Sequence, residues 1–187
     1  GCTVTEYLAG IYAYAFVQQY KSYENRKPGL PIKISVPVNL RPYYNSKTLR
    51  NFATFVNVCV YPNKIHSLAD SINAVKKEMR LLIQMKKLQK TVSQNVAEEK
   101  MLITKIAPNI LKKLVMKFCF HEFGEKKYTS PFSNLGFVDV PETMRPYIDR
   151  FESVIGETPF NCVYCTAVGF GNKLSVTVSS VTKANSI

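Results

Sequence analysis

Cys162 and Cys165 have the C-x-x-C spacing found in redox and zinc sites. A redox pair usually lies at a turn or a helix start, and tetrahedral zinc needs two further ligands. Here the pair falls inside an apolar run that predicts a strand, where residues three apart point to opposite faces. With no second pair in the sequence, we interpret both as core cysteines. The sequence has five cysteines, an odd number, and they lack the regular spacing of a disulfide framework. This favours reduced thiols in a cytoplasmic protein.

Imidazole can come only from His66 and His121. Neither has a neighbouring His, nor an Asp or Ser at a spacing typical of an acid–base site, so we interpret them as helix-end or surface residues. The nucleotide-binding loops G-x-G-x-x-G and G-x-x-x-x-G-K-[ST] do not occur, and "GFGNK" from Gly169 to Lys173 predicts a hairpin. No residue of this sequence is therefore predicted to be catalytic or to bind metal.

The remaining polar features lie beside predicted core strands. They occur in "ISVPVNLRPYYNSKTLRNF" and in "FSNLG", and comprise Asn39, Arg41, Arg50, Asn51, Ser133 and Asn134. A buried Asn or Arg is costly unless its hydrogen bonds are satisfied. Each of these side chains therefore either ties loops together or faces a cleft, and the pattern by itself leaves both interpretations open.

Hydrophobic periodicity and turn residues predict the elements that must position these side chains. Thr3 and Glu6 form a capping-box pair at the start of the first helix. Helices are expected at 3–20 and 65–90, with further helical segments over 91–123, and a short helical turn at 141–147. Strands are expected at 33–38, 53–61, 132–138, 150–156, 161–169 and 173–180. This order predicts a single α+β domain over 1–187, a mixed α/β sandwich with helices packed on a mixed sheet.

The 187 residues are 46% hydrophobic and 12% aromatic, which suits a packed core. No apolar run approaches the roughly 20 residues of a membrane span. The formal charge is +12, and the segment 75–127 holds 13 Lys or Arg against 5 Glu. This basic helical face is either a solvated surface or a surface that attracts nucleic acid, an anionic cofactor or an acidic protein. The aromatic residues do not alternate with Lys or Arg as a base-stacking platform would, which disfavours nucleic acid.

Two blocks carry a family likeness. "SVPVNLRPYYNSKTLRNF" followed by "FSNLGFVDVPETMRPYIDRFE" resembles the chloramphenicol-acetyltransferase-like superfamily of acyltransferases. The likeness is greatest to the C-terminal half of alcohol acetyltransferases and of peptide-synthetase condensation domains, and it covers about 3–180. The resemblance implies two similar lobes with an acyl-donor tunnel between them. It also implies a catalytic base, the second His of an H-H-x-x-x-D motif, which deprotonates an alcohol or amine that attacks an acyl-CoA or carrier-protein thioester.

The H-H-x-x-x-D motif is absent here, and the last predicted strand ends in Ser179 and Ser180 where such a lobe could carry histidines. The resemblance therefore implies a C-terminal lobe that is inactive without its N-terminal lobe and has no covalently bound cofactor. It places Asn39, Arg41 and Asn51 at the lobe interface. Ser133 and Asn134 would line the cleft and contact the thioester or a developing oxyanion.

Two alternatives remain open: a non-catalytic scaffold of the same fold whose basic surface engages an anionic partner, and an unrelated basic α+β domain that binds nucleic acid. A lobe without its partner should expose an apolar interface, so we expect the isolated chain to self-associate.

Overall fold

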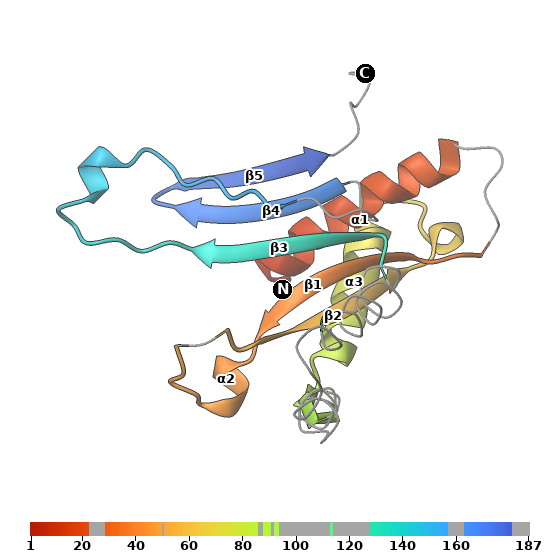
Figure 1. Ribbon diagram of the computed structural model, residues 1–187. Helices are drawn as coiled ribbons and strands as arrows, with labels where there is room; N and C mark the ends of the chain where they lie inside the picture. Colours follow the sequence, from red (N-terminus) through yellow and green to blue (C-terminus); the bar gives the residue numbers. More distant parts are fainter. Residues whose placement is uncertain are drawn as a thin grey trace.

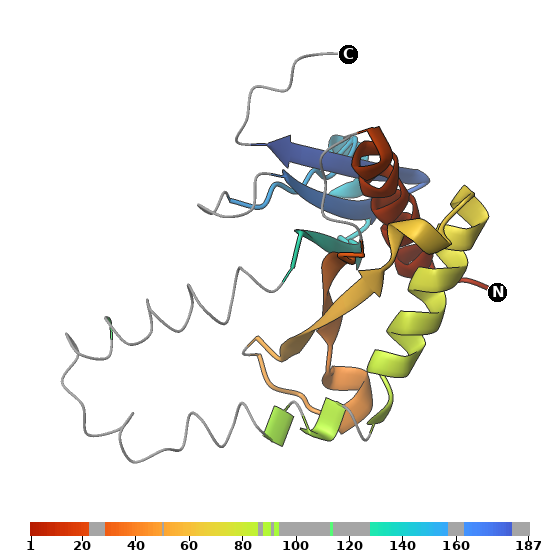
Figure 2. The same ribbon diagram turned by 90° about the vertical axis from the view of Figure 1, so that its right-hand side faces the viewer.

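The computed structural model describes residues 1–22, 29–49, 51–85, 88–90, 92–93, 113, 128–156 and 163–180. Five strands form one mixed sheet, and the two long helices pack together on one of its faces (Figures 1 and 2). The α+β class expected from the sequence is therefore confirmed. In chain order the elements are α1 (Val4–Ser22), β1 (Ile32–Asn39), α2 (Arg41–Tyr44), β2 (Ala53–Val60), η1 (Pro62–Lys64), α3 (Leu68–Leu82), β3 (Ser130–Phe137), η4 (Arg145–Tyr147), β4 (Val163–Phe170) and β5 (Lys173–Ser180).

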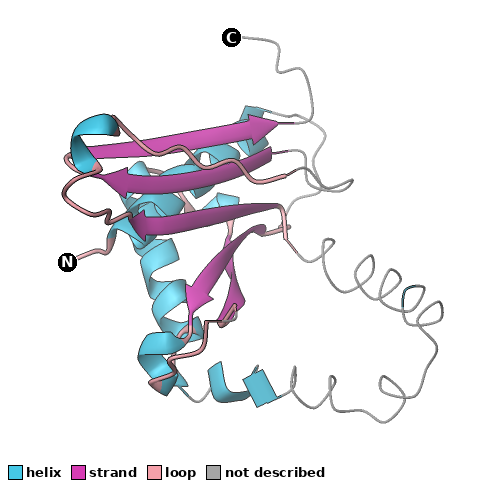
Figure 3. Cartoon of the chain, turned by 60° about the vertical axis from the view of Figure 1, so that its left-hand side comes forward, coloured by secondary structure: helices cyan, strands magenta, loops and turns pink. Residues whose placement is uncertain are grey.

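The strand order across the sheet is β2-β1-β3-β4-β5. The three central strands β1, β3 and β4 run parallel, and the outer strands β2 and β5 are antiparallel to their neighbours. Figure 3 shows the strands with the helices on one side. Pairing between β1 and β3 covers only Ile34 with Ser130 and Ser35 with Pro131. The two strands then separate toward their carboxyl ends, as Figure 1 shows.

The first helix begins as predicted. The Thr3 hydroxyl accepts the Glu6 N–H at 3.2 Å, and the Glu6 carboxylate accepts the Thr3 N–H at 2.8 Å. The long helix predicted at 65–90 is confirmed only in part. The helix α3 begins at Leu68 and ends at Leu82, and the described residues 85 and 88–90 are again helical after a break at 83–84. Ser67 and Asp70 form a capping box at its start, which fixes the first residue of the helix. The predicted helices over 91–123 lie almost entirely outside the described residues.

The predicted strand at 150–156 is wrong. These residues form an extended segment without strand pairing, and it lies across the sheet face that the helices leave open. Side chains of β4 and β5 hold it there, since Thr166 donates a hydrogen bond to the Ser153 carbonyl and Ser179 donates one to the Ile155 carbonyl at 3.4 Å. The apolar residues alternate over 150–156 because the segment packs against a face of the sheet, although it does not pair with any of the strands. The other predicted strands are confirmed, as is the hairpin turn, where Gly171 has φ +58°.

The core lies between the sheet and the two helices. Alternate residues of β1 and β2, such as Ile34 and Val58, face α1 and α3, and Phe132 of β3 is fully buried beside them. The helices approach closely at Gly10, where a Cβ atom would lie 2.7 Å from the Cα atom of Ile72. The Ser71 hydroxyl donates a 2.8 Å hydrogen bond to the Gly10 carbonyl at this crossing. Among the described residues, no helix has the length and apolar character that crossing a membrane requires.

Candidate functional site

The carboxyl ends of β1, β3 and β4 lie at one edge of the sheet, because these strands are parallel. After β1 the chain turns outward to β2, whereas after β3 it goes the opposite way to β4. Connections that leave neighbouring strands in opposite directions create a topological switch point, the place where open sheets with parallel strands bind ligands. The switch point lies between β1 and β3, and both polar sequence blocks follow or belong to these two strands.

Asn39 and Arg41 stabilise the loop that follows β1. The Asn39 side-chain oxygen accepts the Arg41 backbone N–H at 3.0 Å. The Arg41 guanidinium donates from Nε and Nη2 to the Thr48 carbonyl at 3.3 and 3.2 Å. Pro42, next in the chain, is the second residue of the single-turn helix α2, where proline is tolerated because this N–H needs no partner within the helix. These contacts are those of residues that tie a loop, and they place the loop beside the carboxyl end of β1.

Asn51 lies in the same loop, two residues before β2 begins at Ala53, and is exposed. The loop closes where the Leu40 N–H donates to the Phe52 carbonyl at 3.0 Å, with the Leu40 side chain buried. Arg50, which the sequence pairs with Asn51, lies outside the described residues. The structure thus places Asn39 at the end of β1 and Arg41 and Asn51 in the loop that follows it, at the switch point.

Ser133 and Asn134 are adjacent on β3 and point to opposite faces of the sheet. Ser133 is half-buried and lies beside Thr166 of β4 on the face opposite the helices. The Asn134 amide points to the helix side, where it donates to the Thr5 hydroxyl of α1 at 2.9 Å. Its side-chain oxygen accepts the Gly136 N–H at 2.9 Å, where Gly136 has φ +78° at a bulge of β3. Asn134 therefore fixes the start of α1 and the bulge at the carboxyl edge.

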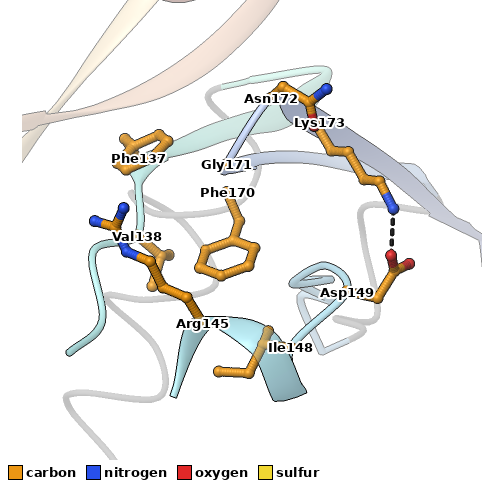
Figure 4. Close-up of a pocket in the computed structure, with 9 residues that line it drawn as sticks. All are labelled: Phe137, Val138, Arg145, Ile148, Asp149, Phe170, Gly171, Asn172 and Lys173. Atoms are coloured by element: carbon orange, nitrogen blue, oxygen red, sulfur yellow. Dashed lines mark hydrogen bonds and ion pairs between the residues drawn. The ribbon is translucent and has the colours of Figure 1, made fainter. Parts of the chain in front are cut away.

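A cavity of about 270 Å³ lies farther along the same edge, between the end of β3 and the β4–β5 turn (Figure 4). Its apolar part includes Phe137, Ile148 and Phe170. At its rim Arg145 pairs with Asp139 outside the cavity at 2.8 Å, and Lys173 pairs with Asp149. The Lys173 ammonium lowers the pKa of the Asp149 carboxyl, mainly through their hydrogen bond. Because each cation already has an acidic partner, this cavity offers no excess charge for an ionic ligand.

His66 lies away from this edge. It follows β2 at the end that pairs with the start of β1, so it is at the opposite edge of the sheet from Asn39. It is exposed, and its backbone N–H donates to the Asp70 carboxylate at 3.1 Å. His121 lies outside the described residues. No imidazole of the described residues is therefore positioned to act as a base at the switch point.

Sequence reasoning missed a buried polar cluster beneath α1. The Tyr12 and Ser130 hydroxyls are 2.6 Å apart, and the Ser130 hydroxyl also donates to the Val163 carbonyl. Burial raises the pKa of Tyr12 to about 12 and that of nearby Cys165 to about 11. Cys165 is buried in β4, which fits its interpretation as a core residue; Cys162 lies outside the described residues. The cluster joins elements more than 100 residues apart, so no local spacing could have indicated it.

No family model matches the chain, and no curated protein matches it. A solved structure, "Crystal structure of Vinorine Synthase", is similar at 12% sequence identity with a TM-score of 0.43, over 90% of this chain and 35% of that one. The chain thus spans about a third of the length of that protein.

Proposed function

We propose that this chain is the C-terminal lobe of a two-lobe, CoA-dependent acyltransferase that transfers an acyl group from a thioester to an alcohol or amine. One observation carries the proposal. The two sequence blocks that resemble the acyltransferase superfamily are about 80 residues apart in the chain, yet they lie on or directly after neighbouring parallel strands, β1 and β3. These strands flank the switch point, where a ligand would lie in a sheet of this kind.

In this proposal the N-terminal lobe supplies the catalytic histidine, since the described residues place none at this edge. The loop containing Asn39, Arg41 and Asn51 shapes the lobe interface through its internal hydrogen bonds. The Ser133 hydroxyl contacts the thioester or donates a hydrogen bond to the developing oxyanion. Asn134 holds β3 against α1, and it affects the reaction only by keeping β3 in place. The donor is an acyl-CoA or a carrier-protein thioester.

The decisive experiment begins with the natural coding sequence upstream of Gly1. The proposal expects a preceding lobe that contains H-H-x-x-x-D. The two-lobe protein should release free CoA from acetyl-CoA when alcohols and amines are supplied, as thiol titration would detect. Changing the second His of the motif to Ala should abolish release. Ser133→Ala should lower kcat about 10-fold or more without a matching loss of folding stability.

A matched control is Ser175→Ala on β5, which removes a hydroxyl from the same sheet face but away from the switch point. It should leave kcat unchanged. An upstream region without H-H-x-x-x-D would overturn the enzymatic proposal and leave the non-catalytic scaffold as the better interpretation. Equal kcat for Ser133→Ala and wild type would remove Ser133 from the site.

A further inference from the structure

Helix α1 carries apolar side chains on two opposite sides. The inner side, with Ala9, Ala13 and Val17, is fully buried against the sheet. On the outer side, Val4, Tyr7 and Ile11 recur at helical spacing and are 57%, 48% and 37% exposed. A surface helix usually turns a polar stripe to solvent, whereas a helix that is apolar all round is buried between two layers. Nothing in the described part of the chain covers the outer side of α1.

Strand β5 has a matching uncovered surface. Leu174, Val176 and Val178 point to the side of the sheet that carries the helices, because Val178 pairs with the core residue Cys165. They are nevertheless 50%, 49% and 60% exposed. Between β5 and α1 runs a trough of about 700 Å³, lined by Val163, Val178 and side chains of α1 from Tyr12 to Ser22. Figure 2 shows both helices on one side of the sheet and β5 at its end.

We propose that a second copy of this chain covers this surface, in a two-fold symmetric dimer where α1 of each copy lies in the trough of the other. The ridge formed by α1 and the trough beside it make the surface self-complementary. A two-fold axis between ridge and trough places each ridge over the trough of its partner, as an isologous interface requires. The two α1 helices then form one layer between two sheets, and each gains an apolar contact on its outer side.

The charge distribution supports a second copy as the occupant. The chain carries a formal charge of +12, so two copies repel each other wherever basic residues meet. The residues that line the trough are all uncharged. Depletion of charge is typical of the central part of protein interfaces. This surface is therefore one where like-charged copies can approach.

The area is also adequate. The exposed parts of the six apolar side chains on α1 and β5 amount to about three whole side chains, or roughly 500 Å². The walls of the trough add to this, which places the surface between a weak interface of roughly 600 Å² per partner and the ~800 Å² of a standard one, as a concentration-dependent dimer requires. A small ligand would leave most of this surface uncovered.

The test is the oligomeric state of the 187-residue chain, measured by sedimentation velocity over about 1–200 µM. We expect a monomer–dimer equilibrium. Ile11→Lys on α1 and Val176→Glu on β5 should each weaken the dimer at least about tenfold. Phe55→Lys is the matched control, because Phe55 is 65% exposed but lies on β2 at the other end of the sheet; it should leave the dimer unchanged. Circular dichroism verifies that each variant is folded.

Mixing the two variants tests the arrangement. Ile11→Lys and Val176→Glu should form a heterodimer, because one interface then pairs Lys with Glu while the other stays wild type. Wild-type hydrogen exchange gives a readout without variants: amides in α1 and β5 should gain protection as concentration rises. A chain that is monomeric at about 200 µM, a dimer that both variants leave intact, or variants that remain monomeric when mixed would each overturn the proposal.

Discussion

Replacing Gly10 by Ala is expected to destabilise the fold, although alanine is the better helix former. Gly10 lies within α1 at its crossing with α3. A Cβ atom there would be 2.7 Å from the Cα atom and 2.8 Å from the Cγ1 atom of Ile72. The first of these atoms belongs to the backbone, so a side-chain rotation cannot relieve the clash. The helices must move apart.

The magnitude follows from three terms. Alanine gains about 1 kcal/mol in helix propensity over glycine. Overpacking of this kind costs about 1–3 kcal/mol. Separation of the helices also lengthens the 2.8 Å hydrogen bond from Ser71 to the Gly10 carbonyl, which contributes about 1 kcal/mol. The net expectation is a loss of about 1–3 kcal/mol in the free energy of unfolding.

Urea unfolding followed by circular dichroism measures this loss as a lower midpoint at an unchanged m-value. Gly156→Ala is the matched control, because a Cβ atom there meets nothing within 4 Å; its stability should stay within about 0.5 kcal/mol of wild type. Ile72→Ala should rescue Gly10→Ala only in part, since the clash with the backbone of residue 72 remains. A Gly10→Ala variant as stable as wild type would refute the close crossing of the two helices.

Three further predictions concern stability, each measured by the same unfolding assay. Burial opposes ionisation of Glu6, but Arg80 and Thr3 hold its pKa below the ordinary value. The stability that ionised Glu6 contributes is therefore present at neutral pH and is lost as pH falls below about 5. Glu6→Gln should make the free energy of unfolding depend less on pH in this acidic range. A pH dependence unchanged in Glu6→Gln would contradict this. Tyr12→Phe should lower the free energy of unfolding by about 1 kcal/mol. Ser130→Ala should lower it further, by about 1–3 kcal/mol, because this change leaves both the Tyr12 hydroxyl and the Val163 carbonyl unpaired. Equal losses for the two variants would count against the shared hydrogen bonds. Asn45 has φ 46°, so Asn45→Ala should cost about 1 kcal/mol while Asn45→Gly leaves stability nearly unchanged, an order that a right-handed conformation at this position would reverse.

The candidate site was only partly predictable. Asn39, Arg41 and Asn51 are close in sequence, and the hydrogen bonds of Asn39 and Arg41 follow from local turn chemistry. Their position relative to Ser133 and Asn134 depends on β1 and β3 being neighbours, which is a long-range pairing. The two faces taken by Ser133 and Asn134 follow from strand alternation, but the partner of Asn134, Thr5, is 129 residues away.

Local patterns in the sequence determined the elements whose signals are local. The capping pair Thr3 and Glu6, the β4–β5 hairpin and the apolar stripes of α1 and α3 depend on contacts a few residues apart, so spacing predicts them. The tertiary structure alone decided which strands are neighbours, that 150–156 covers the sheet instead of joining it, and that an apolar trough runs between α1 and β5. These features depend on contacts between segments that are distant in the chain. Such contacts form because the whole core packs together, and they leave no periodic pattern in the sequence.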